Sequence, residues 1–219
     1  MMKTIYLFRH GQTDWNIQGR YQGDTDVPLN DEGLKQAKLL RELFAQVPCE
    51  MVFASPLTRA IDTAAVATDR PRNEIKIVPG LQEVELGEIE GMTLAQIHSH
   101  FSENHMQRWM SLAKADAEFA FPHGEHRIDA VKRFEKTLFD ICRIHEFRWA
   151  GVCSHGLIMR RFLHYLMTDR YSRDWAPNIE EFPAVKNCHV YELDCDTEAQ
   201  TIHIKKGPVA PLDWREILV

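Results

Sequence analysis

Short apolar runs typical of β-strands alternate with longer segments of helical periodicity along most of this 219-residue chain. The strand-like runs occupy residues 4–8, 51–54, 75–78, 149–153, 189–193 and, more weakly, 201–204. Apolar residues at helical spacing fill residues 31–47, 57–68, 126–146 and 157–167. Strands that alternate with helices favour an α/β fold. We therefore predict a three-layer sandwich, with a mostly parallel central sheet and helices on both of its faces.

One internal segment departs from this alternation. Residues 93–121 are polar, rich in Met, His and Trp, and show helical patterns without any strand-like run. We interpret this region, taken as residues 92–125, as a small helical cap inserted over one end of the sheet. The chain contains no internal repeat and no linker rich in Pro, Gly or Ser. We therefore expect one domain that spans residues 1–219.

Charge and composition argue against several classes of protein. The net charge is −6 and no block of five or six like charges occurs, so we expect no nucleic-acid partner and no membrane partner. No apolar run approaches the roughly 20 residues of a membrane-spanning helix. The five cysteines are scattered and form no C-x-x-C pair, which predicts reduced thiols and a cytoplasmic protein. A homodimer stays open as the oligomeric state.

Charged side chains follow four of the predicted strands at the point where each strand ends. Arg9 and His10 follow the first strand along the chain, and His155 follows the fourth. Arg59 stands in the first turn of the helix after the second strand, and Glu83 follows the third. Because open α/β sheets bind ligands beyond the carboxyl ends of their strands, we expect these five side chains to meet at one edge of the sheet.

Two arginines, two imidazoles and a helix N-terminus form a pocket suited to a small, highly charged anion. A guanidinium group bonds two oxygens of a phosphate at once, so phosphate fits this set best. Gly11 and Gly156, which follow the two histidines, are expected to let the backbone approach the ligand closely. The helix that begins after His155 is expected to add its N-terminal N–H groups. Neither G-x-x-x-x-G-K-[ST] nor G-x-G-x-x-G occurs, which argues against a nucleotide-cradling loop.

Five motifs occur in order along the chain: "RHGQTDWN", "YQGDTDVPLNDEG", "SPLTRAIDTA", "LQEVELGEIEGMT" and "SHGLIMR". They resemble, in turn, the nucleophile motif, the loop after it, the second-arginine motif, the acid motif and the second-histidine motif of the histidine phosphatase superfamily, in its phosphoglycerate-mutase-like branch. The resemblance covers nearly the whole chain. It implies a phosphatase of the histidine acid type that hydrolyses a small phosphorylated metabolite through a phosphohistidine intermediate.

The resemblance also implies roles for individual residues. His10 is the nucleophile, Arg9, Arg59 and His155 hold the phosphoryl group, and Glu83 is the proton donor. The residues expected to bind substrate around them are Thr13, Asn16, Gln22, Gly23, Gly156 and Leu157. No metal or other cofactor is expected, because the arginines supply the positive charge.

The chemistry of these side chains agrees with those roles. A neutral imidazole nitrogen can attack phosphorus, and the neighbouring Arg9 and Arg59 disfavour protonated His10. An alkoxide leaves poorly without a proton, which Glu83 can supply if the bound phosphate favours its protonated form. Water then attacks the phosphohistidine, with the ionised Glu83 as base.

Two rival functions stay open. A phosphoglycerate mutase of this family holds the substrate carboxylate with an adjacent arginine pair in a longer insertion, whereas residues 84–125 contain only Arg108 and Lys114 as cations. A non-catalytic phospho-ligand-binding or signalling protein on the same scaffold usually lacks the nucleophile or the acid, whereas this chain keeps His10 and Glu83. Specificity is expected to depend on residues 92–125 and 170–187, which do not identify the substrate.

Several histidines in and beside the predicted cap raise the question of a metal site, namely His98, His100, His105, His123 and His126. No H-E-x-x-H sequence occurs, and the glycine between His123 and His126 favours a turn, so we expect no metal. The segment "FPHGEHR" resembles the family's Pro-x-Gly-Glu-Ser segment, with His126 where serine is usual. We expect these two histidines at the entrance of the pocket.

Overall fold

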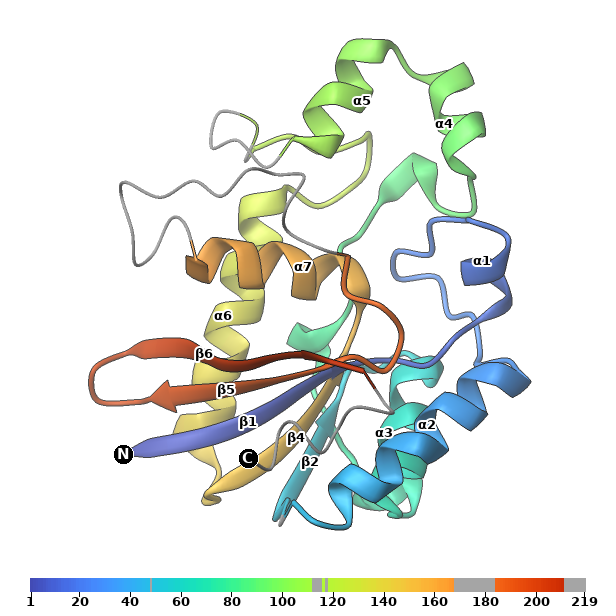
Figure 1. The fold of residues 1–219 in the computed structure, drawn as a ribbon. Coiled ribbons are helices and arrows are strands. Elements are labelled where there is room, and N and C mark those ends of the chain that lie inside the picture. The colour runs from blue at the N-terminus through green and yellow to red at the C-terminus, as the bar shows by residue number, and fades with distance from the viewer. Residues whose placement is uncertain (48, 112–115, 117, 168–183, 211–219) are drawn as a thin grey trace.

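The computed structural model describes residues 1–47, 49–111, 116, 118–167 and 184–210. A six-stranded sheet in the order β3-β2-β4-β1-β5-β6 forms its centre (Figure 1). The strands are β1 (Met2–Arg9), β2 (Met51–Ala54), β3 (Lys76–Ile77), β4 (Trp149–Ser154), β5 (Val190–Asp196) and β6 (Thr201–Val209). The first four strands pair in parallel, and β5 and β6 join the β1 edge antiparallel. The predicted mostly parallel sheet is confirmed.

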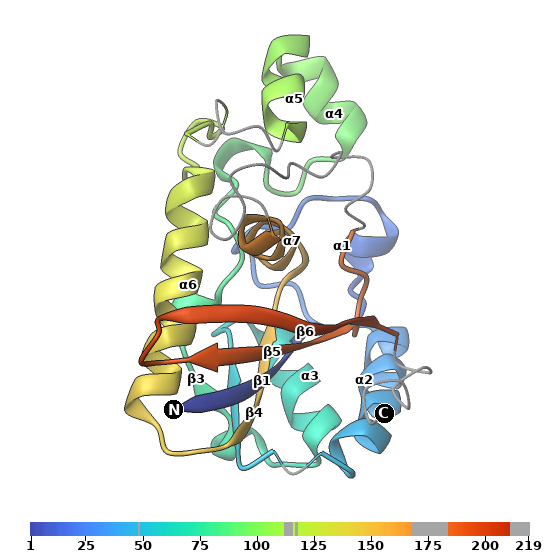
Figure 2. The same cartoon turned by 60° about the vertical axis from the view of Figure 1, so that its left-hand side comes forward.

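Helices cover both faces of the sheet, as the alternating sequence pattern predicts. The described helices are α1 (Asp14–Ile17), α2 (Asp31–Phe44), α3 (Thr58–Thr68), α4 (Leu94–His100), α5 (Glu103–Met110), α6 (Arg127–Ile144) and α7 (Gly156–Tyr165). Helices α2 and α3 lie on one face, and α6 and α7 lie on the other (Figures 1 and 2). The predicted α/β sandwich is therefore confirmed.

Strand β1 shows how the sequence divides the core between these two faces. Ile5 and Leu7 are fully buried in the cluster that contains the apolar residues of α6 and α7. Tyr6 and Phe8, which alternate with them, are buried in the second cluster, with the apolar residues of α2 and α3. Successive strand residues point to opposite faces, so a strand buried on both faces is apolar throughout.

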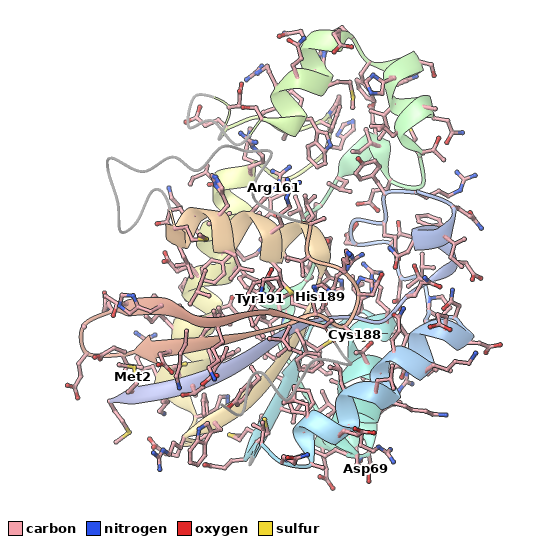
Figure 3. The ribbon with its side chains drawn as sticks, viewed as in Figure 1. Met2, Asp69, Arg161, Cys188, His189 and Tyr191 are labelled. Carbon is pink, nitrogen blue, oxygen red and sulfur yellow. The ribbon has the colours of Figure 1, made fainter. Side chains whose placement is uncertain are left out.

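The segment predicted as a cap contains helices α4 and α5, which stand beyond α7 and α1 at one end of the molecule (Figure 1). Trp109 of α5 is buried and packs edge-on against Tyr21, with ring centroids 6.1 Å apart. The guanidinium carbon of Arg161, on α7 and labelled in Figure 3, lies 4.5 Å from the centre of the Trp109 ring. These contacts tie α5 to α7 and to the loop after α1. Residues 112–115 and 117 of the segment lie outside the described residues.

The structure differs from the predicted elements at several ends. The strand predicted over residues 75–78 contains only Lys76 and Ile77, because 3₁₀ turns at Arg72–Glu74 and Pro79–Leu81 flank it. Helix α1 was not predicted, since four residues are too few for a periodic pattern. Its local signal was a capping box, in which the side chains of Thr13 and Asn16 bond each other's backbone N–H groups.

Candidate active site

Strands β1 and β4 end together at the edge of the sheet where the predicted site residues were expected. Arg9 stands opposite Ser154 in the parallel register, and the backbone N–H of His10 donates to the Ser154 carbonyl at 3.0 Å. The Ser154 hydroxyl donates to the Leu81 carbonyl at 2.8 Å, which fixes the turn just before Glu83. Neighbouring strand ends therefore bring Glu83 to the same edge as His10.

A cavity of about 370 Å³ opens at this edge. The predicted site residues that line it are Arg9, His10, Asn16, Gln22, Gly23, Arg59, Glu83, Gly156 and Leu157. The other lining residues are Gly19, Arg20, Tyr21, Leu86, Leu94, Arg160, Ala184 and Val185. Thr13 and His155, which were expected in the site, are buried and are not among the residues that line the cavity. They lie behind it and contact residues that line it.

His10 is held in one tautomer by its own loop. Its Nδ1 atom lies 2.7 Å from the carbonyl oxygen of Gly11, which can only accept a hydrogen bond, so Nδ1 carries the proton. The Nε2 atom is then unprotonated and has a free lone pair. Burial, followed by the positive charges of Arg9 and Arg59, holds the pKa of His10 well below its usual value of 6.5. The imidazole is therefore neutral at neutral pH.

Arg9 and Arg59, the two arginines expected to hold the phosphoryl group, are fixed by hydrogen bonds to backbone carbonyls. Arg9 donates from Nη1 to the Val185 carbonyl at 2.7 Å. Arg59, on the first turn of α3, donates to the carbonyls of Thr25 and Gly23 at 2.7 and 2.8 Å. Burial lowers the pKa of Arg59 to about 10, so it stays charged at neutral pH. Each terminal nitrogen of Arg59 bears a second N–H, which leaves donors for an anion in the cavity.

The His155 side chain bonds Arg59 and Ser55 and does not line the cavity. Its Nδ1 atom accepts a hydrogen bond from Nε of Arg59 at 3.3 Å, so its Nε2 atom is protonated and donates to the Ser55 hydroxyl at 2.7 Å. The rings of His155 and His10 lie 5.1 Å apart. Burial and the Arg59 charge lower the pKa of His155 well below 6.5. His155 thus orients Arg59 and supports the ring of His10.

Two side-chain amides present N–H groups to the cavity because their oxygens are already engaged. Asn16 Oδ1 accepts from the backbone N–H of Thr13 at 3.1 Å and from Nδ2 of Asn187 at 3.2 Å. Gln22 Oε1 accepts from the Thr13 hydroxyl at 3.0 Å. The NH₂ groups of Asn16 and Gln22 are therefore the ends that an anion would meet. Asn187, which also donates to the His10 carbonyl at 3.0 Å, was missed by the sequence analysis.

Glu83 caps the N-terminus of α7. Its Oε1 accepts from the backbone N–H groups of Val84 and Ile158 at 3.0 and 2.7 Å, and Oε2 accepts from that of Leu157 at 2.9 Å. Two N–H groups in the first turn of α7, those of Leu157 and Ile158, are thus bonded to a side chain of the protein itself. For these two groups the expected contact with the ligand anion is replaced by a contact with Glu83, because a helix N-terminus attracts a nearby carboxylate.

The sequence profile of the histidine phosphatase superfamily (branch 1) matches residues 5–205. The chain belongs to this superfamily. It is 29% identical to the 2,3-bisphosphoglycerate-dependent phosphoglycerate mutase 2 of Gloeobacter violaceus, over 82% of this chain and 81% of that protein. It is 27% identical to phosphoserine phosphatase 1 of Hydrogenobacter thermophilus, over 80% of this chain and 81% of that protein.

The fold is shared with solved structures. A mycobacterial glucosyl-3-phosphoglycerate phosphatase in complex with VO3 superposes with a TM-score of 0.77 at 22% identity, over 95% of this chain and 99% of that chain. These comparisons confirm the superfamily and the fold that the five motifs predicted.

In this histidine phosphatase superfamily member, an ion pair between Arg133 and Glu125 lies beside the loop that carries Glu83. The sequence analysis did not identify this pair. Arg133 of α6 donates to both carboxylate oxygens of Glu125, at 2.8 and 2.7 Å. Arg133 also donates to the carbonyls of Gly80, Gln82 and Glu83, at 3.0 to 3.3 Å. Three of the five hydrogen bonds from this guanidinium therefore hold the segment that carries Glu83, and the other two bind Glu125. Helical spacing does not identify this pair, because Glu125 lies before the start of α6.

The two glycines after the histidines serve packing within the superfamily fold. A Cβ atom on Gly156 would lie 2.8 Å from Cζ of Arg9, and a Cβ atom on Gly11 would lie 2.5 Å from the carbonyl oxygen of Gly33. The missing side chains make room for the Arg9 guanidinium and for the start of α2. The closest neighbours of both positions are thus parts of the protein, not the open space of the cavity.

The two histidines expected at the entrance lie elsewhere. His123 is exposed and faces Glu88 at 3.7 Å, and His126 Nδ1 bonds the Glu118 carbonyl at 2.5 Å just before α6. Neither lines the cavity. In the described part of the chain, no group of three or more His, Cys, Asp or Glu side chains is placed to hold a metal ion. No helix in those ranges is long and apolar enough to cross a membrane.

Proposed function

We propose that this protein is a phosphomonoesterase that hydrolyses a small phosphorylated metabolite through a phosphohistidine on His10. The orientation of His10 carries the proposal. Its Nδ1 proton is held by the Gly11 carbonyl, and its unprotonated Nε2 belongs to a ring that lines a cavity beside two guanidinium groups. A neutral, correctly oriented nucleophile next to fixed positive charge is what phosphoryl transfer requires.

In the first step, the Nε2 lone pair of His10 attacks phosphorus while the bond between phosphorus and the ester oxygen breaks. Glu83 gives its proton to that oxygen, and the alcohol leaves. Arg9, Arg59, Asn16 and Gln22 meet the phosphoryl oxygens, on which negative charge is spread in the transition state. His155 acts through Arg59, as a positioning residue.

In the second step, water attacks phosphorus and the bond from phosphorus to Nε2 breaks. Ionised Glu83 takes a proton from the water, so inorganic phosphate leaves and both His10 and Glu83 return to their starting states. The mechanism is of the histidine acid type and needs no metal, because side chains supply all of the positive charge it uses.

A rapid-quench experiment with p-nitrophenyl phosphate tests the proposal. The protein should release p-nitrophenol and carry acid-labile phosphate during turnover, and His10→Ala should abolish both. His98→Ala, which changes an exposed histidine of α4, is the matched control and should leave turnover unchanged. Turnover by His10→Ala at the wild-type rate would refute His10 as nucleophile. Binding of phosphate without any turnover by the wild-type protein would favour the non-catalytic alternative.

The mutase alternative is disfavoured by the surroundings of Arg108, one of the two cations in residues 84–125. Arg108 bonds Asp116 at 3.1 Å, lies over Phe119 and does not line the cavity. Lys114 lies outside the described residues. With 3-phosphoglycerate and a trace of 2,3-bisphosphoglycerate, we expect inorganic phosphate rather than 2-phosphoglycerate as the product.

A further inference from the structure

The nucleophile loop, residues 10–13, is held by side chains that do not reach the cavity. The carbonyl of Gly11 accepts the Nδ1 proton of His10, so Nε2 stays unprotonated while this carbonyl keeps its direction. A peptide group is planar, and its N–H and C=O therefore turn together. The state of the His10 ring thus depends on what bonds the two peptide groups on either side of Gly11.

Gln36 of α2 bonds the peptide group that contains the Gly11 carbonyl. The N–H of this group belongs to Gln12 and donates to Oε1 of Gln36 at 3.0 Å. Its carbonyl accepts from Nδ1 of His10 at 2.7 Å. Gln36 therefore fixes the plane of the carbonyl that sets the tautomer, although it is not among the residues that line the active-site cavity.

Thr63 of α3 bonds the preceding peptide group, which joins His10 to Gly11. The Thr63 hydroxyl accepts from the Gly11 N–H at 2.9 Å and donates to the Arg59 carbonyl at 2.7 Å. The His10 carbonyl, on the other side of this peptide group, accepts from Asn187 at 3.0 Å. Thr63 is fully buried and does not line the cavity. Its hydroxyl thus connects the nucleophile loop to the helix that carries Arg59.

Loss of either bond would leave a backbone N–H group without an acceptor in a closely packed loop. A Cβ atom on Gly11 would lie 2.5 Å from the Gly33 carbonyl oxygen, so the start of α2 packs directly against the loop. The Gln12 carbonyl accepts from the backbone N–H of Asn30 at 3.1 Å. An N–H that loses its acceptor here is costly, and rotation of its peptide group towards another acceptor relieves the cost. Such a rotation moves the Gly11 carbonyl away from Nδ1 of His10.

We propose that Gln36 and Thr63 are positioning residues for the nucleophile, which hold the two peptide groups beside Gly11 and thereby keep Nε2 of His10 unprotonated. This inference rests on the proposed phosphatase function, in which Nε2 is the attacking atom. The role concerns formation of the phosphohistidine and not the binding of phosphate. Carbonyls of another loop hold the Arg59 guanidinium, and neither Gln36 nor Thr63 bonds that group.

Paired substitutions test each residue. Gln36→Met removes the acceptor oxygen and keeps much of the side-chain length, whereas Gln36→Glu keeps an acceptor. Thr63→Val removes the hydroxyl and keeps the shape, whereas Thr63→Ser keeps the hydroxyl. In rapid quench with p-nitrophenyl phosphate, Gln36→Met and Thr63→Val should each form the phosphohistidine about 10- to 100-fold more slowly, the loss that a slightly misplaced reacting group causes. Gln36→Glu and Thr63→Ser should recover most of this loss.

Two further measurements distinguish positioning from a general defect of the fold. Competitive inhibition by inorganic phosphate should be unchanged in Gln36→Met and Thr63→Val, because the arginines that hold the phosphoryl group keep their own bonds. Nitrogen NMR of the His10 ring should show a proton on Nδ1 in the wild-type protein and a mixture of tautomers in these two variants. A purely structural defect would lower the burst amplitude but would leave the rate constant and the ring signals of the active molecules unchanged.

Matched controls lie in or beside the same two helices. Thr68 of α3 donates to the Ala64 carbonyl, and the exposed Gln46, which follows α2, donates to the Glu42 carbonyl. Thr68→Val and Gln46→Met make the same chemical changes without touching a bond to the nucleophile loop. Both controls should form the phosphohistidine at the wild-type rate.

The outcomes separate the two proposals. If the wild-type protein neither releases p-nitrophenol nor carries acid-labile phosphate, the phosphatase function is wrong, and the NMR measurement, which needs no turnover, still tests the positioning of His10. If the wild-type protein turns over, a wild-type rate of phosphohistidine formation in Gln36→Met or Thr63→Val refutes the role of that residue. A His10 ring that keeps its Nδ1 proton in either variant refutes that role as well.

Discussion

The backbone N–H of Ile158 donates a 2.7 Å hydrogen bond to Oε1 of Glu83, so the proposed proton donor also holds the first turn of α7. The same α7 turn contributes Gly156 and Leu157 to the cavity wall. A substitution at Glu83 can therefore have two effects: it removes the proposed proton donor, and it can displace the part of the cavity wall formed by α7.

Glu83→Gln should separate the acid from the nucleophile. The variant keeps an oxygen for Val84 and Ile158 but places an NH₂ group against the N–H of Leu157. Hydrolysis of an alkyl phosphate should fall by about 100- to 10,000-fold, because its leaving group needs a proton. Hydrolysis of p-nitrophenyl phosphate should fall much less in the first step, and rapid quench should show a burst near one equivalent.

Two carboxylates serve as references for this experiment. Glu85→Gln changes an exposed residue outside the cavity and should leave both substrates unaffected. Glu125, which also lies beside the Glu83 loop, has both of its carboxylate oxygens bonded to Arg133. Equal losses of alkyl and aryl activity in Glu83→Gln, without a burst, would show that Glu83 is not the proton donor.

Arg133→Gln should weaken acid catalysis from a distance. It removes bonds to three carbonyls of the Glu83 loop and leaves Glu125 without its partner, so the free energy of unfolding should fall by about 2 to 4 kcal/mol. Because Arg133 positions Glu83, kcat should fall more for an alkyl phosphate than for p-nitrophenyl phosphate. A purely structural role would lower both equally. Arg143→Gln on the same helix is the control.

The stability of the protein should fall on acidification below pH 6.5. The pKa values of His10 and His155 are lowered in the folded state, so the unfolded chain binds more protons and gains stability relative to the fold as pH decreases. Each histidine should contribute to this loss as the pH falls through its unfolded-state pKa, and its contribution should vanish well above pH 6.5.

Urea unfolding at pH 5.5, 6.5 and 7.5 measures this dependence. His155→Gln should reduce the slope of unfolding free energy against pH, whatever its effect on stability at pH 7.5. His98→Gln replaces an exposed histidine and should keep the wild-type slope. A wild-type slope in His155→Gln would mean that His155 does not contribute to the acid sensitivity.

Exhaustive dialysis against EDTA should leave phosphatase activity unchanged, since Arg9 and Arg59 provide the cationic cradle. Vanadate should inhibit at concentrations well below the KM for substrate, because it can adopt the five-coordinate geometry of the transition state. Activity lost on chelation and restored by a divalent cation would contradict the mechanism.

The sequence was sufficient for the local features of the site. Arg9, His10 and Arg59 follow short apolar strands, and a strand end is a local pattern that predicts which edge of the sheet its side chains reach. The same reasoning does not give the orientation of the His155 ring, which bonds the Ser55 hydroxyl, because the rotation of a side chain at a strand end depends on such neighbours. It also failed for Arg160, which periodicity places on α7 but not on a particular wall.

Contacts between segments that are distant in the sequence could not be predicted, for a different reason. Asn187 reaches His10 only because β5 pairs antiparallel with β1, and Arg133 reaches Glu83 only because α6 packs on the face of the sheet beside the turn after β3. Neither pairing leaves a periodic trace in the sequence. These residues are identified by the sheet order and register, which a single sequence does not specify.

Because His10 and Asn187 are far apart in the sequence, the site can become active only after Asn187 has been synthesised. These residues are 177 positions apart, and Asn187 fixes both the His10 carbonyl and the amide of Asn16. Arg9 is likewise fixed by Val185. A growing chain that has not yet reached residue 184 has its nucleophile but lacks the groups that orient it. Unfinished chains should therefore remain inert towards the phosphorylated metabolites around them until Val185 and Asn187 have been added and can pack against Arg9 and His10.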